Sequence, residues 1–281
     1  MHSLQTRVVR WAYRHSRLFK WLIPIRRPVL LRLADFRLYV CLDDWGVGGR
    51  IAVKRTYEAH VSTLFRSLLE PGAVVVDIGA NIGYYTLLAA TRVGPTGKVI
   101  AFEPKEENCD LLRRSLAAND LHNVVVHCCA VAESDGVAGY YSSSSNGSIS
   151  NDLTRPGARQ VPTVALDDVL AGEPRIDVIK MDIEGAEGRA FQGMQGVLRR
   201  SRPILFSEFS PYSLPKNSGI SGDDYLTLLR AAGYELYAIT PTGGRSATPQ
   251  TNAALMAHFT PSSHLDHIDL LALPQERAPL Q

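Results

Sequence analysis

Four acidic residues stand where apolar, strand-like runs end, and acids placed in this way can bind a cation or move a proton. They are Asp77, Glu103, Asp182 and Glu208. In an open parallel sheet, ligands bind beyond the carboxyl ends of the strands, near the point where the strand order reverses. Folding alone explains poorly why carboxylates recur at this edge, so we expect all four to lie at one ligand site.

The loop after the first of these strands combines two glycines with a preceding acid. It reads Asp77-Ile78-Gly79-Ala80-Asn81-Ile82-Gly83-Tyr84-Tyr85-Thr86. Glycine lets the backbone approach a ligand closely. A dinucleotide fingerprint would need glycine where Asn81 stands, and Asp77 would repel a phosphate. Because the ammonium and sulfonium groups of S-adenosylmethionine are cationic, Asp77 favours that cofactor instead.

A second acid follows the glycine loop at the spacing of a ribose ligand. Glu103 ends the next strand about twenty residues later, where a carboxylate can accept hydrogen bonds from both ribose hydroxyls. An acid at this position is common to NAD and S-adenosylmethionine sites. Only its combination with the residues of the glycine loop discriminates between the two cofactors. The predicted cofactor site comprises Asp77, Gly79, Ala80, Asn81, Gly83, Thr86, Glu103, Pro104, Ala130 and Asp182.

Two other functions remain open at this point. One is an NAD-dependent oxidoreductase, and the other is a protein that binds S-adenosylmethionine without catalysing a reaction. The presence of all four strand-end acids favours an enzyme.

Alternating apolar patterns indicate the elements that position these residues. The run at 73–78 is continuously apolar except for Asp77, as in a central strand that is covered on both faces. Further strands are predicted at 36–42, 99–102, 124–131, 177–182, 204–209, 235–240 and 268–273, the last two as a closing pair that could be antiparallel. Helices are predicted at 57–69, 81–93, 106–119, 186–200 and 223–232. This alternation predicts an α/β fold with a doubly wound, mostly parallel sheet.

Length and polarity suggest one main domain with an extension and an insertion. A chain of 281 residues that is 45% hydrophobic can bury one sizeable core. We expect a helical and strand extension over 1–60 and the main domain over 61–281. The polar segment 139–170 is predicted to be an insertion with a short hairpin. Its serine-rich part, 142–151, could fold over the site when ligands bind, or serve as a flexible linker.

The charge distribution is even overall but uneven at the N-terminus. Formal net charge is +2, which argues against a nucleic-acid partner. Residues 1–37 carry nine basic residues against one acid, with aromatic and aliphatic residues between them. Such a segment can lie on an anionic membrane, or it can pack its apolar side on the domain. Because Pro24 ends the apolar run, we expect no signal peptide and a cytoplasmic protein, which could contact the inner face of the membrane peripherally.

The cysteines do not form a zinc motif. They are Cys41, Cys109, Cys128 and Cys129, and no C-x-x-C pair occurs among them. We therefore expect free thiols and a reducing compartment.

Several motifs together resemble the FkbM family of methyltransferases. They are the runs 75–83, 102–104, 163–167, 179–187 and 203–208, together with Gly193, and they span roughly residues 60–240. The resemblance implies a seven-stranded, Rossmann-like sheet of the class I methyltransferase type. It also implies transfer of a methyl group from S-adenosylmethionine to a hydroxyl of a small molecule, sugar or glycan.

Methyl transfer to an alcohol requires alignment and removal of a proton. The candidates for the base are Asp182, Glu184 and Glu208, with Asp182 as the first choice, although Asp182 could instead orient the methionine part of the cofactor. Lys180, two residues before Asp182, is predicted to be its ion-pair partner. Glu187 is predicted to cap the following helix. The three acids could also bind Mg²⁺, which we do not favour. The oligomeric state is not predicted.

Overall fold

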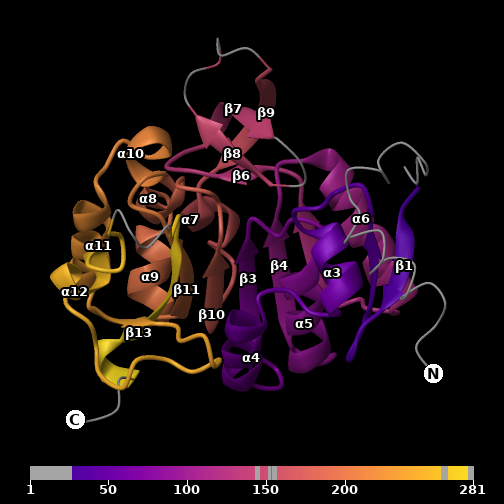
Figure 1. The fold of residues 1–281 in the computed structure, drawn as a ribbon, viewed down its shortest axis with the longest axis horizontal. Helices are drawn as coiled ribbons and strands as arrows, with labels where there is room; N and C mark the ends of the chain where they lie inside the picture. The colour runs from indigo at the N-terminus through magenta and orange to yellow at the C-terminus, as the bar shows by residue number, and fades with distance from the viewer. Residues whose placement is uncertain (1–26, 143–145, 151–152, 154–156, 261–264, 278–281) are drawn as a thin grey trace.

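The computed structural model describes residues 27–142, 146–150, 153, 157–260 and 265–277, and its centre is a seven-stranded sheet (Figure 1). The strand order is β12-β13-β11-β10-β3-β4-β5. Its members are β3 (Val74–Ile78), β4 (Lys98–Phe102), β5 (Val124–His127), β10 (Val178–Met181), β11 (Ile204–Phe209), β12 (Tyr234–Ala238) and β13 (Ile268–Pro274). The strands run parallel except β13, which pairs antiparallel with β11 and β12. The prediction of a mostly parallel sheet with an antiparallel closing pair is confirmed.

Helices cover both faces of this sheet. Because side chains alternate along a strand, Val75 and Val99 pack on one side, with α4 (Ala59–Leu68), α5 (Tyr84–Val93) and α6 (Glu106–Ala118). Val76 and Ile100 pack on the other side. That side carries α7 (Leu166–Val169), α8 (Glu187–Gln192), α9 (Gln195–Ser201) and α11 (Gly222–Ala231). These two hydrophobic cores confirm the doubly wound architecture.

The order of the strands reverses at the centre of the sheet. From β3 the chain moves outward in one direction through β4 and β5, and it later continues in the other direction through β10 and β11. β3 and β10 therefore lie side by side at the reversal, and their carboxyl ends lead into adjacent loops. A crevice at this point is where α/β proteins bind ligands.

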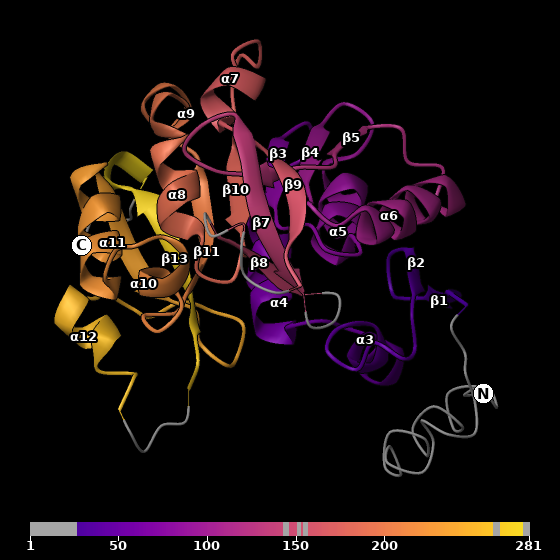
Figure 2. The same ribbon diagram turned by 90° about the horizontal axis from the view of Figure 1, so that it is seen from above.

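A second, four-stranded sheet lies at the carboxyl ends of the central strands (Figures 1 and 2). Its order is β6-β9-β7-β8, formed by β6 (Ala130–Val131), β7 (Gly136–Ser142), β8 (Gly147–Ser150) and β9 (Arg159–Val164). The predicted hairpin of the insertion is β7 and β8, which pair antiparallel. The predicted strand 124–131 is wrong as a single element, because the chain turns at Cys128 and Cys129 and enters this second sheet.

The N-terminal part of the described chain packs against the main domain. A hairpin of β1 (Val29–Arg32) and β2 (Arg37–Val40) precedes α3 (Gly48–Lys54). The backbone N–H of Tyr39 in β2 donates to Ser115 Oγ of α6 at 2.9 Å. The prediction of a strand at 36–42 is confirmed in β2, whereas β1 was missed. Most of the predicted basic segment lies outside the described residues.

Two predicted helices have different limits in the structure. The predicted helix 186–200 is two helices in the structure, α8 and α9, and the chain bends between them at Gly193. The backbone of Gly193 lies against the Ala132 carbonyl group, where a Cβ atom would come within 2.0 Å of the oxygen. The predicted helix 81–93 begins only at Tyr84. Three further short elements are α10 (Leu214–Asn217), α12 (Asn252–Met256) and the 3-10 helix η1 (Gln275–Arg277). Across the described part of the chain, every helix is too short or too polar to cross a bilayer.

Candidate active site

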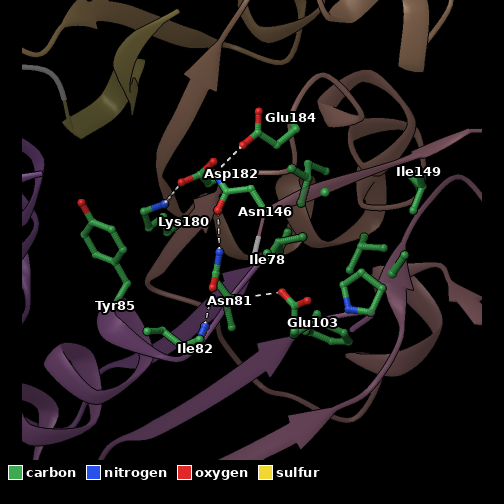
Figure 3. A pocket seen from close by; sticks show the side chains of 18 of the residues that line it. Ile78, Asn81, Ile82, Tyr85, Glu103, Asn146, Ile149, Lys180, Asp182 and Glu184 are labelled. Carbon is green, nitrogen blue, oxygen red and sulfur yellow. Dashed lines mark hydrogen bonds and ion pairs between the residues drawn. The ribbon is translucent and has the colours of Figure 1, made fainter. Parts of the chain in front are cut away.

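A pocket opens at the reversal point of the central sheet, beneath the second sheet (Figure 3). The empty space between its walls amounts to about 780 Å³, a volume that includes the part open to solvent. Predicted residues in its wall are Gly79, Ala80, Asn81, Glu103, Pro104, Ala130, Asp182 and Glu184. Residues that come from distant parts of the chain thus meet at the expected edge.

The loop after β3 makes the tightest contact in the pocket wall. Gly79 has a φ of 82°, and a Cβ atom there would lie 2.0 Å from the Asp182 carbonyl oxygen. The backbone N–H groups of Gly79 and Ala80 both donate to the Phe102 carbonyl oxygen, at 2.9 and 3.0 Å. Glycine is therefore required here to let the loops after β3 and β10 touch.

Asp77, Gly83 and Thr86 do not line the pocket, in contrast to the predicted cofactor set. Asp77 is 1% exposed and accepts a hydrogen bond from Thr86 Oγ1 at 2.6 Å. Burial raises the pKa of Asp77, and the charge of Lys180 opposes this rise. A Cβ atom on Gly83 would lie 2.3 Å from a Leu112 methyl group. Side chains alternate along β3, so the Asp77 side chain points away from the pocket and toward α5. Asp77, Gly83 and Thr86 therefore support the glycine loop on the side that faces away from the pocket.

Glu103 connects the glycine loop with the end of β4. Its carboxylate accepts the backbone N–H of Asn81 and that of Lys105, each at 2.9 Å, and the side-chain amide of Asn108 at 3.2 Å. Burial raises the pKa of Glu103 to about 7, although these hydrogen bonds act in the opposite direction. A carboxylate offers about four acceptor positions, so about one remains for a ligand hydroxyl.

Asp182 is held as an anion by a buried lysine. Lys180 Nζ lies 2.9 Å from Asp182 Oδ2 and 4.2 Å from the centroid of the Tyr85 ring (Figure 3). Burial opposes ionisation of Asp182, but the Lys180 charge and hydrogen bonds with Glu208 and Lys180 outweigh it and hold its pKa at about 2. The predicted ion pair is confirmed. An acid with this pKa is a weak base.

Glu208 lies behind Asp182 and does not line the pocket. Burial, followed by the charge of Asp182, raises the pKa of Glu208 well above its usual value, and the two carboxyl groups share a hydrogen bond. The two pKa values are therefore shifted in opposite directions, upward for Glu208 and downward for Asp182. His267 Nδ1 lies 3.6 Å from Glu208 Oε1, a neighbour that the sequence did not indicate.

Glu184 reaches into the pocket from the loop after β10. Its Oε1 accepts a hydrogen bond from Asn146 Nδ2 at 2.8 Å, and Asn146 Oδ1 accepts one from Asn81 Nδ2 at 2.8 Å. Burial, followed by the charge of Asp182, raises the pKa of Glu184. Asn146 of the second sheet region is thus hydrogen-bonded both to the loop after β3 and to the loop after β10, on either side of the pocket (Figure 3).

Asp182, Glu184 and Glu208 could each offer one oxygen to a metal, within 4.8 Å of one another. Carboxylate oxygens suit Mg²⁺. However, the Lys180 ammonium lies 2.9 Å from Asp182 Oδ2 and already occupies the cation position beside this carboxylate. The arrangement does not fit a resident cation, and we derive no step through one.

Several wall residues were missed by the sequence analysis. Val47 and Tyr57 come from the predicted extension, Tyr85 from α5, and Tyr140 and Ile149 from the second sheet. Aromatic residues in apolar patterns are ordinary core residues, so they carried no signal. Asn146 was indicated only as part of the segment proposed to cover the site. Glu187, predicted to cap, accepts the backbone N–H of Ile183 at 3.2 Å.

A comparison with protein families decides the relationship. The family model described as the methyltransferase FkbM domain matches residues 77–236, more than half of the chain. The chain belongs to the FkbM methyltransferase family. The matched segment begins at Asp77 and includes Glu103, Asp182 and Glu208. Membership in this family supports the methyl-donor interpretation over the nicotinamide one.

Curated relatives are similar over part of their length. Methyltransferase 1 of Beauveria bassiana is 26% identical over 144 residues, which cover 43% of this chain and 57% of the relative. Methyltransferase sdnD of Sordaria araneosa is 31% identical over 155 residues, covering 43% and 60%. The chain thus spans somewhat more than half of the length of these two relatives. The hexuronic acid methyltransferase AglP of Haloferax volcanii is 26% identical over 177 residues, covering 62% and 72%.

Among solved structures, a methyltransferase FkbM from Methylobacillus flagellatus is similar with a TM-score of 0.44 and 17% identity. The similarity covers 79% of this chain and 52% of that one.

Proposed function

We propose that this FkbM family member is an enzyme that transfers the methyl group of S-adenosylmethionine to a hydroxyl of a small molecule or glycan. The observation that supports this most is the pocket at the reversal point, where the glycine loop, Glu103 and Asp182 meet in a chain of this family. When bound, the sulfonium of S-adenosylmethionine supplies an activated methyl carbon. The protein then has to align and desolvate the acceptor and remove its proton.

The wall residues fit the two halves of this cofactor. Glu103 keeps about one acceptor position for a ribose hydroxyl, and Pro104 and Ala130 line the same pocket. Gly79 and Asn81 would contact the methionine part, where Asp182 supplies a negative charge for its cationic groups.

We assign removal of the proton from the acceptor hydroxyl to Glu184. Asp182 was the first choice, but a pKa of about 2 and its hydrogen bonds to Lys180 and Glu208 make it a poor base. Glu208 lies behind Asp182 and does not line the pocket. Glu184 lines the pocket and its pKa is raised, which brings it closer to the range that general bases need. Asp182 then orients the ligands.

The acceptor end of the pocket suits hydroxyl groups. Carboxylates accept hydrogen bonds, and hydroxyl groups donate them. The relative from Haloferax volcanii carries the name of a hexuronic acid methyltransferase, which supports a glycan as one acceptor class.

Mass spectrometry of the products tests the proposal. Glycan and lipid extracts are incubated with the protein and S-adenosylmethionine labelled with deuterium in its methyl group, beside an incubation with Glu184→Gln protein. We expect a labelled methyl group on an oxygen of one acceptor class in the first incubation alone. Labelling on nitrogen or carbon would contradict O-methylation. Cofactor binding without labelling of any extract would favour the non-catalytic alternative.

A further inference from the structure

Two cysteines on neighbouring elements lie close together beside the cofactor acid. Cys109 is on α6 and is fully buried, and Cys128 follows β5 and is partly exposed. Both are free thiols. Their Sγ atoms and a carboxylate oxygen of Glu106 lie within 4.8 Å of one another. Solvent can therefore reach one thiol of a pair whose second member is covered.

This pair is connected directly to the pocket wall. Cys109 Sγ donates a hydrogen bond to the Glu103 carbonyl oxygen at 3.2 Å, and the adjacent Asn108 donates to Glu103 Oε1. On the other side, Cys129 follows Cys128 and lines the pocket. A change in the distance between the two thiols would thus move the wall on both sides of Glu103.

The cation beside Cys128 disfavours metal binding at this pair. Arg113 Nη2 lies 3.0 Å from Cys128 Sγ, and Arg113 Nη1 lies 3.1 Å from Glu106 Oε1. A guanidinium held between these two groups opposes a metal cation at the same place. Burial raises the pKa of the Cys128 thiol, and the Arg113 charge acts in the opposite direction. Cys128 is the more exposed thiol of the pair, so peroxide reaches it before Cys109.

We propose that Cys109 and Cys128 form a peroxide-sensitive dithiol whose oxidation to a disulfide weakens cofactor binding. The cofactor part of this inference rests on the proposed function, because its readout is binding of S-adenosylmethionine. The observation that carries it is the position of the two Sγ atoms between Glu103 and the pocket-lining Cys129.

The chemistry needs hydrogen peroxide as the oxidant and nothing else. The Cys128 sulfur attacks one peroxide oxygen, a sulfur–oxygen bond forms, the oxygen–oxygen bond breaks, and the leaving hydroxide takes the thiol proton to become water. The Cys109 sulfur then attacks the sulfenic sulfur. A sulfur–sulfur bond forms, and the sulfur–oxygen bond breaks with loss of a second water that carries the Cys109 proton. Two thiols lose two electrons, and one peroxide becomes two waters.

The disulfide would alter the cofactor acid in two ways. Cys109 would lose the S–H that donates to the Glu103 carbonyl oxygen. The Sγ atoms would also have to approach to about 2.05 Å, which pulls the turn containing Cys129 toward α6. We expect the loss of this hydrogen bond, together with the displacement of Cys129 in the pocket wall, to weaken binding of S-adenosylmethionine roughly tenfold.

The full chain is tested reduced, after peroxide treatment, and after re-reduction with dithiothreitol. Peptide mass spectrometry without reduction is expected to show a Cys109–Cys128 link after peroxide. Calorimetry is expected to show about tenfold weaker binding of S-adenosylmethionine, restored by dithiothreitol. Cys128→Ser protein should bind as the reduced protein does and should not respond to peroxide. Cys41→Ser protein, a control distant in sequence from both thiols, should remain sensitive.

Three results would overturn the proposal. They are a peroxide-treated protein without the Cys109–Cys128 link, a linked protein that binds S-adenosylmethionine unchanged, and Cys128→Ser protein that loses affinity as the wild type does. If the reduced protein does not bind S-adenosylmethionine, the proposed function fails and the effect on the cofactor fails with it. In that case the mass-spectrometric link still decides whether the dithiol forms a disulfide.

Discussion

Three carboxyl groups whose oxygens lie within 4.8 Å of one another have different pKa shifts because their surroundings differ, and we propose a different role for each. Asp182 faces a buried ammonium and stays ionised. Burial and the neighbouring anion raise the pKa of Glu208 well above its usual value, and Glu184 reaches into the pocket with a raised pKa. Carboxyl pairs whose pKa values are pushed apart in this way are a recurring sign of acid and base roles. The spacing of these acids in the sequence could not reveal this division. The pKa of each carboxyl group depends on its burial and on the charge of Lys180 or of Asp182, which the fold brings near it.

Glu184→Gln tests the assignment of the base. Because glutamine keeps the size of the side chain and cannot accept a proton, we expect turnover to fall by roughly 10²–10⁴. The dissociation constant of S-adenosylmethionine should stay within about twofold, since the assigned role is in chemistry. Steady-state kinetics and calorimetry measure the two effects. Glu106→Gln, an exposed acid outside the pocket, is the matched control, and full turnover by Glu184→Gln protein would refute the assignment.

The same assignment sets the sign of the pH dependence. A base must be ionised to act, so activity falls as pH drops through its pKa. Since the pKa of Glu184 is raised, the acid limb of the rate profile should lie above about 4.3, the ordinary value for glutamate. A limb near pH 2 would point to Asp182 instead.

Lys180→Met tests the buried ion pair through stability. The Lys180 side chain is 6% exposed, and its replacement by methionine leaves the partly buried Asp182, 25% exposed, without its cation. Breaking a buried pair on one side costs about 3–5 kcal/mol of unfolding free energy, measured by urea denaturation. Lys98→Met removes a more exposed partner of Glu173 and should cost about 1 kcal/mol or less. Equal losses in the two variants would show that burial does not strengthen the Lys180 pair.

At the level of elements, the sequence predicted what depends on local pattern. The central strands, their alternation with helices and the acids at their ends follow from apolar runs and stop signals. The break between β5 and β6 was not predictable, because 124–131 is apolar except for His127 and only the pairing of 130–131 with the second sheet separates its halves. The bend at Gly193 depends on the Ala132 carbonyl group, which is distant in sequence. The direction of the Asp77 side chain depends on contact with Thr86 in α5.

Gly79→Ala tests the contact between the loops after β3 and β10. Alanine there would meet the Asp182 carbonyl oxygen at 2.0 Å in addition to a φ of 82°. Gly94→Ala is a matched control, because Gly94 also has a positive φ of 68° but a Cβ atom would meet nothing within 4 Å. We expect the control to lose about 1–2 kcal/mol of unfolding free energy from backbone strain alone.

Gly79→Ala protein should lose more than the control, and it should lose binding of S-adenosylmethionine as well. Denaturation and calorimetry on both variants measure these effects. If the two variants lost equal stability and both bound the cofactor, the close approach of the two loops would have no role.

For the whole molecule, the uneven distribution of charge supports a membrane hypothesis. Residues 1–37 carry the basic and aromatic residues that suit an anionic surface, while β1 and β2 pack on the main domain. Removal of residues 1–26 spares β1 and β2. We expect the full chain to co-sediment with vesicles of anionic lipid at low salt, and the truncated chain to remain in the supernatant. Equal recovery of both forms with the vesicles would remove the hypothesis.

The central claim is that the carboxyl rim of the sheet forms a pocket for S-adenosylmethionine. Titration calorimetry of the reduced, full-length protein with S-adenosylmethionine, S-adenosylhomocysteine and NAD tests it most directly. We expect the first two to bind at one site and NAD not to bind, and we expect Glu103→Gln to weaken binding of both by about tenfold or more. Binding of NAD without binding of S-adenosylmethionine would contradict the claim.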